Sequence, residues 1–293
     1  MTASRDPRSV SLLAAFTLTV VSVALTYALL QGVVALQSIV HGVSWDVARE
    51  RVIRDALGLA LVQAAAFALV LFGAVRLYAR DDEPLRETLG LRAVPFHTVL
   101  LALLAGAALQ FPLAELANLV HLVAPVPAEL LRQQQRLFDA GSPLVAFAAF
   151  VSFVVVAPIT EELLFRGIIL RGARVAYGVP VALALSSALF ALSHVGPVAT
   201  TLYALIAGVV LGAVALRTGS TPVAIALHAG VNAMPVLLPA RLLRIPGFNV
   251  LPVADGSSAH ISPALVVASS LVAAVALALL SRTAPAAEDE KDG

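Results

Sequence analysis

The chain has 293 residues, of which 60% are hydrophobic and only 13% charged, and its formal net charge is +1. A soluble domain typically carries about 25% charged residues, so this composition, with a mean hydropathy of +0.94, indicates an integral membrane protein. The near-neutral charge and the lack of a basic cluster exclude nucleic acid as an expected partner. Because the chain has no cysteine, it can form no disulfide or thiolate metal site, and it has no cysteine nucleophile.

The apolar residues gather in eight segments. The first follows Arg5 and Arg8 and stays uncharged over residues 9–40, much longer than the apolar core of about 7–15 residues in a signal peptide, which indicates a retained helix. Continuous Ala, Leu and Val runs favour helices over the alternating strands of a barrel. Because a span needs roughly 20 residues, we expect an all-α polytopic membrane helical bundle of about eight transmembrane helices. The segments lie near residues 10–40, 56–75, 98–123, 142–165, 177–194, 197–216, 219–239 and 261–281.

The domain organisation is expected to be simple. Residues 1–281 should form a single transmembrane helical domain, and residues 282–293 a disordered acidic tail. Lys and Arg are more frequent in the connections on the N-terminal side than on the opposite side, so both termini are expected in the cytoplasm. The preference for Arg over Lys and the many Ala and Val residues indicate a GC-rich bacterial genome, and hence a bacterial cytoplasmic membrane.

Glu161, Glu162 and Arg166 stand together in an apolar segment that carries no charge over residues 142–160. A charge near the centre of a bilayer costs roughly 2.5–3.5 kcal/mol, and ionisable residues there are functional by default. Glu162 and Arg166 are four residues apart and can pair on one helix face, which leaves Glu161 without an evident partner. Pro158 lies one turn earlier and should kink or loosen the helix. The alternative is structural, with a Glu162–Arg166 strut and Glu161 at a wet helix end.

Two further polar groups follow on later helices. His194 closes its apolar segment, while His228 and Asn232 are four residues apart and share one helix face. A carboxylate, two imidazoles and an amide from three helices can activate a water and stabilise an oxyanion. Two alternatives stay open: hydrogen bonds between membrane helices, and a zinc site formed by Glu161, His194 and His228. No His-Glu-x-x-His motif is present, so the sequence does not require a metal.

Three ordered motifs carry a family resemblance. Glu-Glu-x-x-x-Arg at 161–166, Phe-x-x-x-His at 190–194 and His-x-x-x-Asn at 228–232 resemble the CPBP family, which comprises the type II CaaX prenyl endopeptidases and the bacteriocin-processing or Abi-type membrane proteases. The resemblance makes residues 142–240 the expected catalytic core and implies hydrolysis of peptide bonds within or at the membrane. Family members are described both as metalloproteases and as glutamate-dependent proteases without a bound metal, so a zinc cofactor stays open.

The resemblance also implies a role for each motif residue. It makes Glu161 the general base, His194 a holder of the attacking water, His228 and Asn232 the groups that stabilise the oxyanion, Glu162 and Arg166 orienting groups, and Phe190 a packing neighbour of the site.

The expected partners are the lipid bilayer and a membrane-protein or lipidated-peptide substrate, prenylated if it is of the CaaX type. A second function of the same fold would be a non-proteolytic membrane scaffold or bacteriocin-immunity protein. A third would be a transporter or channel with an intramembrane proton relay. The lack of internal repeats disfavours this third function.

Overall fold

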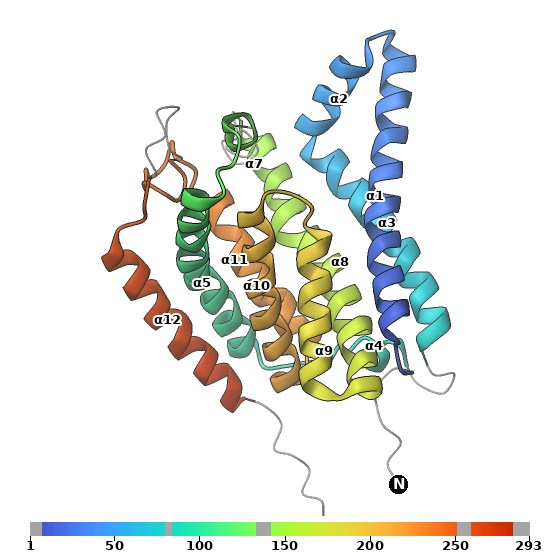
Figure 1. Ribbon diagram of the computed structural model, residues 1–293, viewed down its shortest axis with the longest axis vertical. Helices are drawn as coiled ribbons and strands as arrows, with labels where there is room; N and C mark the ends of the chain where they lie inside the picture. Colours follow the sequence, from blue (N-terminus) through green and yellow to red (C-terminus); the bar gives the residue numbers. More distant parts are fainter. Residues whose placement is uncertain (1–7, 80–83, 133–141, 251–258, 284–293) are drawn as a thin grey trace, which may run out of the picture.

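The computed structural model describes residues 8–79, 84–132, 142–250 and 259–283. Within these ranges the regular structure is helical, apart from one isolated bridge between Pro246 and Val250, and the helices form a bundle (Figure 1). The predicted fold class is therefore confirmed. Most of the predicted acidic tail, residues 284–293, lies outside the described residues.

The bundle is built mainly from long apolar helices. Polar caps define several ends: the Ser11 hydroxyl accepts from a backbone N–H in the first turn of α1, and the Asp55 carboxylate does the same for α3. In chain order the elements are α1 (Leu12–His41), α2 (Trp45–Arg54), α3 (Ala56–Tyr78), α4 (Leu85–Thr88), α5 (Phe96–Val123), α7 (Pro143–Ala149), η1 (Phe150–Val156), α8 (Ala157–Glu162), η2 (Leu163–Leu170), α9 (Arg171–Ser193), α10 (Val198–Thr218), α11 (Thr221–Leu237) and α12 (Pro263–Arg282).

Among the described residues, six helices are long and apolar enough to cross a membrane, and the apolar helix α11 is shorter, with 17 residues. The predicted count of eight is not confirmed. Two of the predicted segments, 142–165 and 177–194, lie in one helical run of 51 residues, Pro143–Ser193. Gly178 interrupts that run with φ 77° and ψ 174°, a conformation open to glycine because it has no Cβ.

The helices α5 and α11 cross in direct backbone contact. A Cβ atom at Gly106 would lie 2.0 Å from the carbonyl oxygen of Leu227, and one at Gly230 would lie 2.2 Å from that of Leu103. Only glycine permits so close an approach, as at other crossings of membrane helices. This contact fixes the position of α11 relative to α5, and hence the position of the polar residues on α11.

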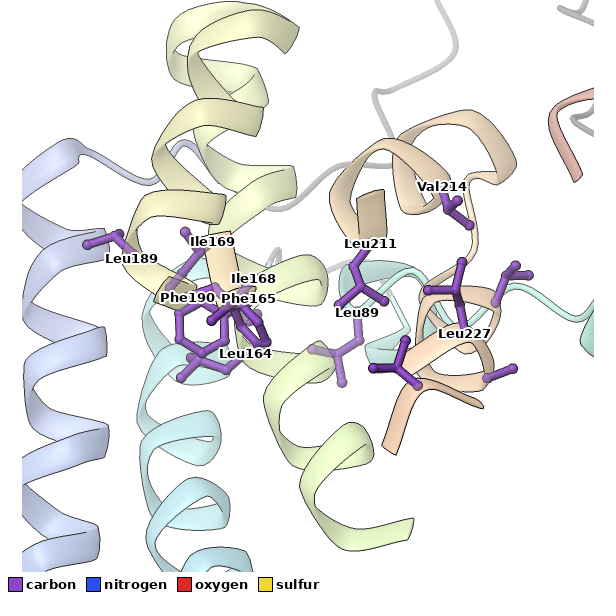
Figure 2. Packing of buried hydrophobic residues seen from close by; sticks show 14 of the residues in the cluster. Leu89, Leu164, Phe165, Ile168, Ile169, Leu189, Phe190, Leu211, Val214 and Leu227 are labelled. Atoms are coloured by element: carbon purple, nitrogen blue, oxygen red, sulfur yellow. The ribbon is translucent and has the colours of Figure 1, made fainter. Parts of the chain in front are cut away.

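A buried apolar cluster joins η2 to α9, α10 and α11. Figure 2 shows Phe165 and Phe190 together in this cluster, and their ring centroids lie 5.3 Å apart at an interplanar angle of 89°. Edge-to-face contacts of this kind stabilise a pair of rings beyond the area that they bury. The cluster therefore holds the C-terminal half of α9 against η2, next to the charged residues of α8 and η2.

Candidate active site

Glu161 and Glu162 are the last two residues of the short helix α8, which lies between the π-helical segments η1 and η2. Pro158 in the first turn of α8 has no N–H to donate, so the loosening predicted from the sequence takes the form of wide π-helical turns. Such turns are rare and frequently occur at functional sites. Adjacent helical residues point about 100° apart, so the two carboxylates have different surroundings.

The Glu162 carboxylate is completely buried, and its Oε1 is paired, whereas its Oε2 has no hydrogen-bond partner in the described structure. Its Oε1 accepts from Arg166 at 2.8 Å and from Nδ1 of His228, also at 2.8 Å. Arg166 is buried as well, donates to the carbonyl oxygen of Gly208 at 3.0 Å, and lies 4.4 Å from the centroid of the Phe190 ring. This network joins α8, η2, α9, α10 and α11 at one point and realises the ion pair predicted from the sequence spacing.

The Glu161 carboxylate has no cationic partner as close as Arg166 is to Glu162. Its Oε1 accepts from the amide Nε2 of Gln63 on α3 at 3.0 Å. Its Oε2 is buried without a hydrogen-bond partner in the described structure, and it lies 3.8 Å from Nε2 of His194. A separation of 3.8 Å is too long for a hydrogen bond, so this oxygen is free to accept a proton.

The two histidines are held through Nδ1. At the end of α9, Nδ1 of His194 lies 2.8 Å from the carbonyl oxygen of Phe190, and since a carbonyl can only accept, Nδ1 is the protonated nitrogen. Nδ1 of His228 likewise faces the Glu162 carboxylate. Both imidazoles border the same cavity, so Nε2 is in each case the nitrogen left for chemistry.

Asn232 lies one turn after His228 on α11. Its Nδ2 donates to the carbonyl oxygen of Phe153 in η1 at 2.9 Å, which leaves its second N–H and its Oδ1 for other partners. Phe190 lies between the imidazoles, with its ring centroid 4.6 Å from that of His194 and 5.8 Å from that of His228. The aromatic ring thus separates the two histidines and fixes their spacing.

A cavity of about 890 Å³ opens beside these groups. It is lined by Glu161, His194, His228, Asn232 and Phe190, whereas Glu162 and Arg166 lie behind its wall. The rest of its lining comes from α3, α5, η1, α8, α10, α11 and the segments that follow α5, α9 and α11, and most of it is apolar. The structure thus brings the residues singled out from the sequence together around one space, while their catalytic roles stay predictions.

Three residues at this cavity, Gln63, Gln110 and Tyr203, were missed in the sequence. Gln63 binds Glu161, and Tyr203 of α10 donates a hydrogen bond to the side-chain oxygen of Gln110 on α5. For Gln63 a signal existed, because it is the one side chain with hydrogen-bonding groups between Ala56 and Val75. An amide inside an apolar helix is costly enough to warrant a search for its partner.

A zinc site formed by Glu161, His194 and His228, which the sequence left open, can be compared with the arrangement of these side chains. Metal-binding histidines usually donate the other ring N–H to a carboxylate or a carbonyl, and His228 and His194 both do so. However, no group of three His, Asp or Glu side chains within the described ranges lies close enough together to hold an ion. The arrangement shown does not form the ligand set of Glu161, His194 and His228, and we derive no step through a metal.

Comparison with known proteins gives one family. Residues 143–234 match the family described as type II CAAX prenyl endopeptidase Rce1-like. The match spans α7 to most of α11 and contains all three motifs, so it confirms the resemblance inferred from them. No curated protein and no solved structure matches the chain.

Proposed function

We propose that this chain, whose residues 143–234 are similar to the Rce1-like type II CAAX prenyl endopeptidases, is an intramembrane endopeptidase of the glutamate type. The observation that carries the proposal is the environment of the Glu161 carboxylate. Its Oε2 has no hydrogen-bond partner in the described structure and faces Nε2 of His194 across 3.8 Å, and the residue lines a large cavity within a bundle of apolar helices. A carboxylate so placed can take a proton from a water bound between it and the imidazole.

The proposed reaction has two steps. In the first, Glu161 removes a proton from the water, which His194 also holds, and the water oxygen forms a bond to the carbonyl carbon of the scissile peptide. In the second, the C–N bond breaks and the leaving amine takes the proton from Glu161. The products are a new carboxyl terminus and a new amino terminus.

The oxyanion formed between these steps needs donors. Asn232 has one N–H free of its bond to Phe153, and His228 as an imidazolium would donate through Nε2 while Nδ1 stays on Glu162. Glu162 would balance that positive charge. Its own bond to Arg166 keeps this acid out of proton transfer, which is why we assign the base to Glu161 and not to its neighbour.

The substrate we propose is a membrane protein or a lipidated peptide, with prenylated CaaX-type peptides as the class that the family match favours. The apolar lining of the cavity supports a substrate that approaches from the bilayer. The enzyme would act in a bacterial cytoplasmic membrane, with both termini in the cytoplasm.

The test is quantitative mapping of peptide termini in membranes from cells that express the wild type, Glu161→Gln or Glu50→Gln at equal levels. Glu50 is a suitable control because it is a helical glutamate of the same chain that lies at an exposed position, where it pairs with Arg54. We expect fragments that depend on the wild type to persist with Glu50→Gln and to disappear with Glu161→Gln. Identical termini in all three samples would reject proteolysis and favour the non-proteolytic scaffold.

A further inference from the structure

Gln63 lies on α3, outside the segment that matches the protease family. It is half-buried in the wall of the cavity, and its amide donates to Oε1 of Glu161, 98 residues further along the chain. A longer contact of 3.4 Å reaches the hydroxyl of Thr160. These contacts connect a helix with no other role at the site to the proposed general base.

In this contact the Gln63 amide is the hydrogen-bond donor and the Glu161 carboxylate is the acceptor. The Nε2 group of a glutamine can only donate, so Oε1 of Glu161 is the acceptor in this contact. An unprotonated carboxyl oxygen accepts a hydrogen bond better than a protonated one, so the contact favours Oε1 as the oxygen that stays without a proton. The other oxygen, Oε2, is the one that faces His194 and lacks a hydrogen-bond partner in the described structure. Gln63 therefore distinguishes the two oxygens of an otherwise symmetric carboxylate.

We infer that Gln63 is a positioning residue, which fixes the rotamer of Glu161 and directs proton transfer to Oε2. This inference rests on the proposed proteolytic function. Without the amide, the carboxylate can turn about its terminal torsion, which is broad and roughly two-fold in carboxylate side chains, and the oxygen beside His194 is no longer selected. General bases lose much of their effect when such geometry is lost.

A competing explanation is that Gln63 fills space or joins two helices. Methionine and histidine separate the two explanations. Met matches Gln in length and volume but has no donor, whereas His carries an N–H at a similar distance from the backbone and fills the space less well. If packing is the role, Met should be tolerated better than His; if positioning is the role, the order should be reversed.

The experiment measures kcat and KM of purified protein in lipid vesicles, with an internally quenched peptide that copies the most abundant cleavage site found by terminus mapping. We expect Gln63→Met to lower kcat about 10- to 100-fold, the effect of one hydrogen bond to a charged group, with KM unchanged. Gln63→His should recover part of kcat. The control Leu61→Met changes a lipid-facing position on the same helix, which is 71% exposed, and should behave as the wild type.

The possible results separate this inference from the proposed function. Loss of cleavage in Glu161→Gln establishes proteolysis first, and an unchanged kcat in a folded Gln63→Met variant would then overturn the inference alone. A rise in KM at constant kcat would also overturn it, because that result indicates a substrate contact. If Gln63→Met does not fold, Gln63→His is compared with Gln63→Asn, whose donor is one methylene too short. A higher kcat in Gln63→His supports the positioning role, and equal kcat values in the two variants would overturn it. Absence of wild-type cleavage would reject both proposals.

Discussion

Arg166 is the residue on which most of the site depends. Its guanidinium is fully buried, yet it has a carboxylate, a backbone carbonyl and an aromatic face around it, supplied by Glu162, Gly208 and Phe190. The planar, delocalised guanidinium is suited to such mixed contacts, whereas the point charge of a lysine is not. Arg166 therefore compensates Glu162 and at the same time sets the position of the ring that separates the two histidines.

Removal of one member of this buried pair should destabilise the protein strongly. We expect Arg166→Met to lower the free energy of unfolding by about 3–5 kcal/mol, because Glu162 would keep a buried charge with the His228 imidazole as its hydrogen-bond partner. The double variant Glu162→Gln/Arg166→Met should recover part of that loss, since both charges are then gone. Thermal unfolding of the purified variants in the same detergent measures the loss of stability in the single variant and its recovery in the double variant.

The matched control for this prediction is the exposed pair of Glu50 and Arg54 on α2. Exposed ion pairs contribute little, so Arg54→Met should unfold close to the wild-type temperature. If Arg166→Met also unfolded close to the wild-type temperature, the network around Arg166 would not be a source of stability.

At the scale of elements, the site depends on one helix crossing. His228 lies two residues before Gly230, and Gly230 touches the backbone of α5 at Leu103. Any side chain at Gly230 must push α11 away from α5. Since Nδ1 of His228 reaches Glu162 at 2.8 Å, a shift of a few tenths of an ångström already weakens that hydrogen bond.

The substitution Gly230→Ala tests this dependence. A Cβ atom there would lie 2.2 Å from a backbone oxygen, so we expect a loss of about 1–3 kcal/mol in stability together with a lower cleavage rate. Gly73→Ala on α3 is the control, because nothing lies within 4 Å of its added Cβ. That variant should be as stable as the wild type or more so, since alanine favours the helix. Equal behaviour of the two variants would contradict the role given to the crossing.

At the scale of the whole molecule, the sequence predicted the helical class and the polar residues that lie within apolar segments. The helix class, the start of α3 and the end of α5 followed from composition, and Glu161, Arg166 and His228 were found because charge and imidazole are rare among Ala, Leu and Val. The ion pair of Glu162 and Arg166 followed from helical spacing. Local patterns of this kind need only the neighbours in the chain.

The parts that were missed depend on contacts between distant segments. Gln63 binds Glu161, which lies 98 residues further along the chain, and no local sequence pattern predicts a contact over that separation. Pro158 predicted a disturbance of the helix but not its form, the π-helical turns on both sides of α8. The predicted count of eight spans is not confirmed, because the segments 142–165 and 177–194 lie in one helical run that Gly178 interrupts.

The orientation of the bundle is the remaining property that the fold makes testable. The helix α1 begins and α12 ends at the same end of the bundle, and the connection between α9 and α10 lies at the opposite end (Figure 1). Because the chain has no cysteine, single cysteines can be introduced without background. Ser9→Cys, Thr283→Cys and Val195→Cys occupy exposed positions, and Val195 is 83% exposed in that connection.

With both termini in the cytoplasm, a membrane-impermeant maleimide should label Val195→Cys in intact spheroplasts, and Ser9→Cys and Thr283→Cys only after permeabilisation. Labelling of Ser9→Cys and Thr283→Cys from different sides would contradict the bundle, and labelling of both in intact spheroplasts would contradict the orientation inferred from Lys and Arg. Val195 also borders the cavity, next to His194. The side from which Val195→Cys reacts is therefore the membrane face toward which the proposed active site opens.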